Sequence, residues 1–325
     1  IGRDSLQAAH WLVWRLKGGL GVATVGANTV FAAITGISIA SAAIFSRIAV
    51  PPLVDAGFTR RFAVGLVAGS SVLGMLIPPS LLLIVYGLVA EVSISRLFLA
   101  AIVPGLLLAG AFSLGIIVAV SARWRFAVAD NQIGETPDPI NAHSALKKAT
   151  PIAILVLIVL GGIYGGVFTP TEAGAIGSLA AALLAIGMKR IKCKALGNLI
   201  TEAAANSASI LFLIITASAF AMMLTLSGIP TLLSDHIAAA NLELTSYAIG
   251  YLVVLIALGM VLDSTSILLI MVPLALPTIQ ALGGDLIWFG VVSVIGVEIG
   301  LLPPPLGLSV YAIKASLEDE SITLN

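Results

Sequence analysis

The chain has 325 residues, of which 59% are hydrophobic and only 10% are charged, and its mean hydropathy is +1.12. A soluble domain carries about a quarter charged residues, so the composition excludes a soluble protein and indicates a polytopic protein of the lipid bilayer. The formal net charge is zero, which gives no reason to expect a nucleic-acid partner, and the single cysteine, Cys193, excludes an intrachain disulfide and a cysteine metal cluster.

The first part of the chain predicts a helical hairpin followed by a broken helix, and we interpret residues 1–122 as a first repeat. Two apolar arms within 18–53 flank the polar tip Gly36-Ile37-Ser38-Ile39-Ala40-Ser41. This segment is predicted to enter and leave the membrane on the same side. A spanning helix over 62–90 is predicted to break at Pro78-Pro79, and one further span returns after it.

The longest polar stretch, residues 123–150, is interpreted as a cytoplasmic linker between the first repeat and a second repeat over 151–325. Five helical segments are predicted between this linker and the second hairpin. They are two short spans, an amphipathic segment, a longer span and an interfacial helix, over 151–167, 173–188, 194–206, 207–226 and 231–240.

A second hairpin is predicted over 244–278. There Leu258-Gly259-Met260-Val261-Leu262-Asp263-Ser264-Thr265-Ser266 interrupts an apolar run and places Asp263 at membrane depth. A bare charge at the bilayer centre costs at least about 2.5–3.5 kcal/mol, so such a carboxylate indicates function. Each arm is shorter than the roughly 20 apolar residues that a crossing needs. A last broken helix is predicted over 286–316.

The interruptions of the two halves match. The breaks Gly74-Met75-Leu76-Ile77-Pro78-Pro79 and Gly300-Leu301-Leu302-Pro303-Pro304-Pro305 are offset by 226 residues, and the tips by about 222. Paired interruptions at corresponding places are the best sequence indication of a secondary-transporter binding site. The predicted fold is therefore an all-α polytopic membrane protein of two inverted repeats, each with a re-entrant hairpin and a Pro-Pro broken helix.

The distribution of positive charge predicts the orientation, because Lys and Arg gather in cytoplasmic loops. With the mouth of the first hairpin in the cytoplasm, fourteen cations lie inside and one, Arg96, lies near the outer surface, while Arg47 lies within a hairpin arm. The fourteen are Arg3, Arg15, Lys17, Arg60, Arg61, Arg123, Arg125, Lys147, Lys148, Lys189, Arg190, Lys192, Lys194 and Lys314.

Helix ends at the two tips favour ion and anion binding. The first arm presents unpaired carbonyls, which suit a sodium ion, and the second arm presents unpaired amides, which suit a carboxylate. The hydroxyl oxygens of Ser38, Ser41, Ser264 and Thr265 are hard ligands for a hard cation. Asp263 has three open interpretations: it ligates a cation, takes a proton, or serves as an ordinary helix N-cap.

Other features at membrane depth are less specific. The Pro-Pro breaks free backbone carbonyls, and their occurrence in both halves favours a cavity-lining role over a simple kink. Glu298 is a second intramembrane carboxylate, and the sequence leaves open whether it belongs to the site, pairs with a partner or lies near an interface. Glu172 begins a helix and is interpreted as an acid that favours the helix dipole.

The motifs of enzymes are absent from the sequence. It has no Gly-x-Ser-x-Gly elbow, no His-Glu-x-x-His and no Walker loop. Any active transport must therefore draw energy from an ion gradient or from another chain.

Several segments together resemble a known family, and their order and spacing extend over nearly the whole chain. They are Gly18-Gly19-Leu20-Gly21-Val22-Ala23, Gly36-Ile37-Ser38-Ile39-Ala40-Ser41-Ala42-Ala43, Gly74-Met75-Leu76-Ile77-Pro78-Pro79-Ser80, Tyr86-Gly87, Phe168-Thr169-Pro170-Thr171-Glu172-Ala173, Asp263, Phe289-Gly290 and Gly300-Leu301-Leu302-Pro303-Pro304-Pro305-Leu306-Gly307. These segments resemble the large membrane subunit, or permease, of the tripartite ATP-independent periplasmic (TRAP) transporters.

The resemblance implies an elevator-type, sodium-coupled importer of organic acid anions such as C4-dicarboxylates, in the bacterial inner membrane. It implies no cofactor beyond Na⁺ as the coupling ion. Its partners would be a small four-helix membrane subunit and a periplasmic substrate-binding protein. Family members are similar in using the tips and breaks for ion and substrate, with sodium held here through Ser38, Ser41, Asp263 and Ser264. The implied site residues are Gly36, Ser38, Ser41, Gly74, Pro78, Pro79, Ser80, Asp263, Ser264, Thr265, Gly300, Pro304 and Pro305.

The chain departs from the family pattern at a few positions. Ile37 stands where the first tip usually has a serine, Pro303 where the second break usually has a threonine, and Gly296 where an asparagine is common. The family pattern also continues beyond both ends of this chain, so we expect a fragment.

Three other functions remain as alternatives. A stand-alone divalent-anion symporter with the same hairpins would work without a binding protein. An intramembrane enzyme would need a reactive pair, for which Asp263 and Glu298 are the available carboxylates. A scaffold without transport activity would leave the two matched polar breaks unexplained.

Overall fold

The computed structural model describes residues 2–129, 141–191, 193–240 and 242–317, and within them the chain forms fourteen α-helices. Lys192, the middle of the predicted linker and residues 318–325 lie outside the described residues, as do the side chains of Cys193 and Lys194. The helices are α1 (Gly2–Val13), α2 (Gly19–Thr35), α3 (Ser38–Asp55), α4 (Arg60–Leu76), α5 (Leu81–Val89), α6 (Ile94–Ser121), α7 (Ala142–Tyr164), α8 (Pro170–Gly187), α9 (Cys193–Ser227), α10 (Ile229–Ala239), α11 (Leu244–Gly259), α12 (Ser264–Ala281), α13 (Leu286–Gly300) and α14 (Leu308–Leu317).

The prediction of an all-helical polytopic membrane protein is confirmed. Six helices in the described part of the chain are long and apolar enough to cross a membrane, or seven if the bent pair α4 and α5 is one span. That pair bends by 43° at the break, and the second break separates α13 from α14. A helix satisfies the hydrogen bonds of its own backbone N–H and C=O groups, and lipid offers no other partner for them.

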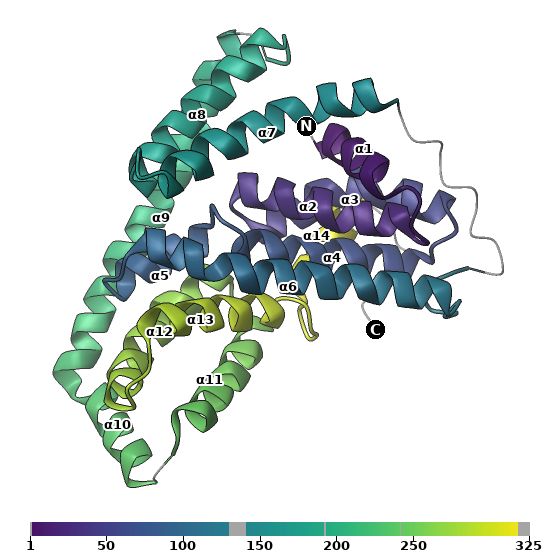
Figure 1. Ribbon diagram of the computed structural model, residues 1–325. Coiled ribbons are helices and arrows are strands. Elements are labelled where there is room, and N and C mark those ends of the chain that lie inside the picture. The colour runs from purple at the N-terminus through teal and green to yellow at the C-terminus, as the bar shows by residue number, and fades with distance from the viewer. Residues whose placement is uncertain (1, 130–140, 192, 241, 318–325) are drawn as a thin grey trace.

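The two hairpins pack in matched ways (Figure 1). The first arm of each lies against the first piece of the broken helix that follows it, α2 against α4 and α11 against α13. The second arm lies against the last piece of the other broken helix, α3 against α14 and α12 against α5. The two halves of the chain therefore interlock, although the repeat boundaries and their inversion stay predictions.

Buried side chains form two clusters that correspond to this packing. One gathers around α2, α3 and α4 and includes Phe45 and Val67. The other gathers around α5, α11, α12 and α13 and includes Leu255 and Phe289. The long helix α6 contributes to both clusters and crosses the molecule beside them (Figure 1).

Several helices differ from the boundaries that the sequence predicted. Helix α7 begins at Ala142, inside the predicted linker, and the segments predicted over 194–206 and 207–226 form the single helix α9. The polar residues that prompted a division of α9 are accommodated, because Thr201 donates to the carbonyl of Gly197 within the same helix, at 3.0 Å. A buried or lipid-facing hydroxyl satisfied in this way does not end a helix.

The second arms of the hairpins are also longer than predicted. Helix α3 contains Pro51 and Pro52, and α12 continues through Pro273 and Pro277, because a membrane helix tolerates prolines when its neighbours satisfy the freed carbonyls. Each arm has 18 residues, which corresponds to about 27 Å and approaches the roughly 30 Å of the hydrocarbon core. The re-entrant topology of the hairpins therefore stays a prediction.

Candidate functional site

The first tip is a two-residue turn between α2 and α3. Gly36 ends α2 in the left-handed region with φ 69°, and its amide donates to the carbonyl of Ala32. An L-residue in that conformation costs about 1–2 kcal/mol, so the turn favours glycine. Ile37 then extends with φ −139°, and Ser38 begins α3 without a side-chain cap from Ile37.

The second tip is capped by an acid. Asp263 precedes α12, and its carboxylate accepts from the amide of Ser266 at 3.1 Å and from the hydroxyl of Ser266 at 2.5 Å. The side chain is exposed. The structure therefore gives Asp263 the role of an N-cap, one of its three open interpretations, and leaves its carboxylate accessible. A role in transport stays a prediction.

The two tips meet at one carboxylate. Ser38 and Ser264 are the first residues of α3 and α12 and are 226 positions apart. Both hydroxyls donate to Oε1 of Glu298, Ser38 at 3.3 Å and Ser264 at 2.9 Å. Glu298 lies in the last turn of α13 and is 1% exposed. Its Oε2 is buried and has no hydrogen-bond partner among the described residues.

This arrangement is suited to binding a cation. A buried carboxylate requires a proton, a paired cation or a metal ion to offset its desolvation. Carboxylate and hydroxyl oxygens are hard ligands, and Oε2 of Glu298 has capacity left for one more contact. Both serines begin helices, so the backbone amides of two helix N-termini also converge here. Their partial positive charge would favour a bound anion beside the cation.

A second polar cluster supports the first tip. Asn28 of α2 donates to the carbonyl of Val67 at 3.0 Å and to the hydroxyl of Ser70 at 2.7 Å. Its Oδ1 accepts from Ser41 at 3.1 Å. All of these side chains are buried. One amide thus joins α2, α3 and α4, and Ser41 is occupied in this cluster instead of at Glu298.

Each break lies beside a close helix contact. A Cβ on Gly74 would lie 2.0 Å from Cβ of Ala32 on α2, and a Cβ on Gly300 would lie 2.9 Å from Cα of Gly259 on α11. In lipid, where helices associate by close packing, small residues allow such approach. The first arm of each hairpin is therefore fixed against its broken helix just before the Pro-Pro pair.

The breaks themselves are alike in backbone geometry and differ in exposure. The Pro78-Pro79 and Pro304-Pro305 peptide bonds are both cis. Ser80 is buried and caps α5 by accepting from the amide of Leu83 at 3.3 Å. Pro304 and Pro305 are exposed.

The predicted site residues are thus only partly brought together. Ser38 and Ser264 converge on Glu298, and Gly36, Gly74 and Gly300 shape the tips and contacts that position them. Thr265 is half-buried in the first turn of α12. Ser41 bonds to Asn28, while Ser80 and Asp263 cap helices.

Sequence reasoning left the role of Glu298 open and did not identify Asn28. Glu298 is the acid within the apolar run of α13, and Asn28 is the amide within the apolar run of α2, so their polarity at membrane depth was the available signal. Gly296, where an asparagine was expected from the family pattern, faces α11: a Cβ there would lie 2.6 Å from Leu252. Glycine at this position permits the close approach of α11 and α13.

Comparison with known proteins gives a consistent result. Residues 1–319 match the family model described as the tripartite ATP-independent periplasmic transporter, DctM component. The chain is 32% identical to the C4-dicarboxylate TRAP transporter large permease protein DctM of Pseudomonas aeruginosa, over 97% of this chain and 73% of that protein.

Two further relatives have different named substrates. The isethionate TRAP transporter permease protein DctMQ of Oleidesulfovibrio alaskensis is 32% identical over 96% of this chain and 48% of that protein. The sialic acid TRAP transporter large permease protein SiaM of Vibrio cholerae is 29% identical over 94% of this chain and 70% of that protein.

Proposed function

This chain belongs to the DctM-component family of tripartite ATP-independent periplasmic transporters, and from that premise we propose that it imports organic acid anions by sodium-coupled transport. As a member of this family, the chain is a transporter subunit for organic acids and not an enzyme, and it is a multi-pass bacterial membrane protein. The proposal adds the sodium gradient, the inner membrane and delivery of substrate by a periplasmic binding protein.

The observation that carries the proposal is the meeting of both hairpin tips at Glu298. Hydroxyls from two segments 226 positions apart bond one buried carboxylate oxygen, and within the described part of the chain the other oxygen has no hydrogen-bond partner. A sodium ion at Glu298 would neutralise the carboxylate and hold both tips together. Ion binding and tip position would then be coupled, as sodium-driven transport requires.

The ligand set for sodium is drawn from the tips. Ser38 and Ser264 already lie at Glu298, while Ser41 and Asp263 lie within the same two turns. Ser41 would need to exchange its bond to Asn28, and Asp263 has an exposed carboxylate that is accessible to an ion. Movement of the hairpins with their broken helices, in an elevator mechanism, would carry this site across the membrane.

The substrate class follows from the helix ends and from the relatives. Three relatives are named for a C4-dicarboxylate, isethionate and sialic acid, all of them organic acids. The amides that begin α3 and α12 offer donors to an anionic group. A carboxylate substrate is therefore proposed.

The proposed partners are a small four-helix membrane subunit and a periplasmic binding protein. The isethionate relative, of which this chain covers 48%, is long enough to contain a second membrane component in one chain. Here the small membrane subunit would be either a separate chain or a further part of the same polypeptide.

The test is uptake by the complete protein in liposomes, together with the small subunit and the binding protein encoded beside it. Labelled C4-dicarboxylates, 2-oxo acids, isethionate and sialic acid are offered with and without an inward sodium gradient. Uptake that requires both sodium and the binding protein supports the proposal. Uptake without the binding protein would favour a stand-alone symporter, and uptake indifferent to sodium would contradict the coupling.

A further inference from the structure

One arginine lies within a hairpin arm, and the candidate site described above does not use it. Helix α3 is long and apolar enough to cross a membrane, and Arg47 is its tenth residue, about 14 Å along the helix from Ser38 at the tip. An arginine at membrane depth is costly unless other groups satisfy its donors, and such a residue indicates function. The partners of Arg47 therefore decide what it does.

Arg47 bonds the end of the last helix. Its Nε donates to the carbonyl oxygen and to the hydroxyl oxygen of Ser316, each at 2.7 Å. That hydroxyl donates in turn to the carbonyl of Ala43 on α3, at 2.6 Å. Ser316 lies in the last turn of α14, where carbonyls lack partners within the helix and carry partial negative charge. Arg47 thus caps the carboxyl end of α14 and fastens it to α3, and we call these three bonds the α3–α14 brace.

Helix α3 therefore spans the second break. Its first residue, Ser38, bonds Glu298 on α13, which precedes the break. Further along α3, Arg47 bonds Ser316 on α14, which follows the break. Helix α14 also packs against α3, and its Ile313 is fully buried in the core cluster around α2, α3 and α4. The two pieces of the last broken helix are thus held relative to each other by a helix from the other half of the chain.

The second hairpin has no such arginine. The position 226 residues after Arg47 is Pro273 on α12, and proline has neither a backbone N–H nor a side-chain donor. On α3, Pro51 and Pro52 leave the carbonyls of Arg47 and Ile48 without their usual helical donors. The first hairpin is therefore weakened just beyond Arg47, where a bond to a neighbouring helix supports it most.

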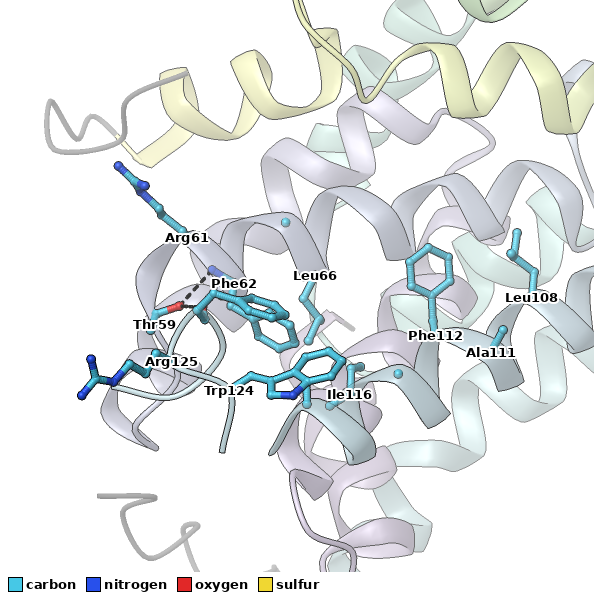
Figure 2. A pocket seen from close by; sticks show the side chains of 14 residues that line it. Thr59, Arg61, Phe62, Leu66, Leu108, Ala111, Phe112, Ile116, Trp124 and Arg125 are labelled. Carbon is cyan, nitrogen blue, oxygen red and sulfur yellow. Dashed lines mark hydrogen bonds between the residues drawn. The ribbon is translucent and has the colours of Figure 1, made fainter. Parts of the chain in front are cut away.

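A groove elsewhere in the molecule supplies a control position. It lies between α4 and α6 and has a volume of about 840 Å³, and Figure 2 shows Leu66 and Phe112 in its walls. Gly115 also lines it, and a Cβ there would meet no atom within 4 Å. No described residue of α14 lines this groove. Gly115→Ala therefore changes a nearby pocket without touching the α3–α14 brace.

We propose that Arg47 is a positioning residue of the candidate site, which holds Ser38 of the first tip in register with Glu298 by fastening α14 to α3. Its role in transport rests on the sodium-coupled function proposed above. Arg47 itself touches neither ion nor substrate and acts through Ser38. With the brace in place, the first hairpin and the last broken helix move as one body.

The first test is the sodium dependence of uptake by the complete protein with its small subunit and binding protein. Arg47→Met keeps the length of the side chain but removes its donors, whereas Arg47→Gln keeps an N–H donor at the position of Nε. We expect Arg47→Met to raise the sodium concentration for half-maximal uptake by about fivefold, and Arg47→Gln by about twofold or less. Arg96→Met, at an exposed arginine on α6, and Gly115→Ala should leave it unchanged.

A double variant separates positioning from general stability. Because Arg47 acts through Ser38, adding Ser38→Ala to Arg47→Met should give a total rise of about fivefold, and not the roughly 25-fold product of two independent effects. The full product would overturn the proposal, since Arg47 would then act elsewhere. Unchanged sodium dependence in Arg47→Met would overturn it as well.

Hydrogen exchange tests the brace without uptake. Backbone amides of the first tip, residues 36–41, and of α14 should exchange about fivefold faster in Arg47→Met and at an unchanged rate in Arg96→Met. Equal exchange in the two variants would overturn the proposal. Absence of sodium-dependent uptake by the unaltered protein would instead contradict the proposed function, and the exchange rates would still decide whether Arg47 holds the tip.

A cross-link gives the converse test. Arg47→Cys with Ser316→Cys, in a protein without other cysteines, removes the brace and should behave as Arg47→Met does. Joining the two thiols with a short bifunctional reagent should restore the sodium dependence to within about twofold of the unaltered protein. A joined protein that takes up no substrate would show that α3 and α14 must separate during transport, which would contradict their movement as one body.

Discussion

Each of the two hairpins donates a serine hydroxyl to Glu298, but different interactions hold the two tips in place. The first tip lacks a side-chain cap at Ile37 and depends on the buried amide of Asn28, which joins α2, α3 and α4. The second tip is capped by Asp263, and no such amide supports it among the described residues, although a close glycine contact beside the break is common to both hairpins.

The difference shows that matched backbones carry unmatched chemistry. The position 226 residues before Glu298 is Val72, and the position 226 residues after Asn28 is Val254, which is 43% exposed. The carboxylate thus comes from the second half alone, while the buried amide that supports the first tip comes from the first half alone. Substitution of corresponding residues should therefore have unequal effects.

The largest expected effect is on stability, at the contacts beside the breaks. Gly74→Ala would place a Cβ 2.0 Å from Ala32, whereas Gly300→Ala would place one 2.9 Å from Gly259. We expect Gly74→Ala to lower the free energy of unfolding by about 3 kcal/mol, as overpacking does at its upper range, and Gly300→Ala by less. Thermal unfolding in detergent measures both.

The control for these variants is Gly26→Ala on α2, where a Cβ meets no atom within 4 Å. This change should leave the unfolding midpoint unchanged or raise it slightly. If Gly74→Ala were as stable as the control, the close contact of α2 with α4 would be wrong.

A smaller loss is expected at the polar cluster of the first hairpin. Asn28→Ala would leave Ser41 and Ser70 without the amide they bond, which should cost about 2 kcal/mol. The corresponding Val254→Ala, at an exposed position, should change stability by less than about 0.5 kcal/mol. Equal unfolding midpoints for the two variants would show that the amide does not support the first hairpin.

The serines of the tips should affect ion binding more than stability. Ser264→Ala and Ser38→Ala each remove one hydrogen bond to Glu298, worth about 1 kcal/mol. Each should raise the sodium concentration for half-maximal uptake by about fivefold, with the larger effect from Ser264 and its shorter bond. Because both bonds share one oxygen, the double variant should lose less than the product of the two.

The matched control is Ser71→Ala, since Ser71 is buried and bonds only the carbonyl of Ala68 within its own helix, at 2.7 Å. It should leave the sodium dependence unchanged. A shift in Ser71→Ala equal to that in Ser264→Ala would mean that the serines act through helix stability and not through Glu298.

The smallest effect on stability is expected at Asp263, where Asn retains the cap but removes the charge. Asp263→Asn should therefore keep the free energy of unfolding within about 0.5 kcal/mol. Under the proposed function the carboxylate of Asp263 also binds sodium, so we expect uptake at limiting sodium to fall by about threefold in Asp263→Asn. Unchanged uptake would restrict Asp263 to its role as a cap.

Local sequence patterns predicted the backbone features well because these depend on neighbouring residues. The polar tips and the Pro-Pro breaks were located from interruptions in apolar runs, and both breaks lie where expected. The tip offset of about 222 was wrong, because it aligned the polar stretches instead of the helix starts. The first residues of α3 and α12, Ser38 and Ser264, are 226 positions apart, the same offset as the breaks.

The centre of the candidate site could not be predicted in this way. Glu298 meets Ser38 across 260 positions, and Asn28 meets Ser70 across 42 positions, and such contacts depend on how helices pack. Prolines within α3 and α12 also gave a misleading stop signal, because neighbouring helices can satisfy the carbonyls that proline leaves free.

The most direct test of the central claim is the sodium dependence of uptake by Glu298→Gln, in the complete protein with its small subunit and binding protein. Glutamine keeps an oxygen to accept from Ser38 and Ser264 but removes the charge. The control is Glu202→Gln, an exposed carboxylate on α9. The account predicts that Glu298→Gln needs about tenfold or more sodium for half-maximal uptake while the control is unchanged. Normal sodium dependence in Glu298→Gln would contradict it.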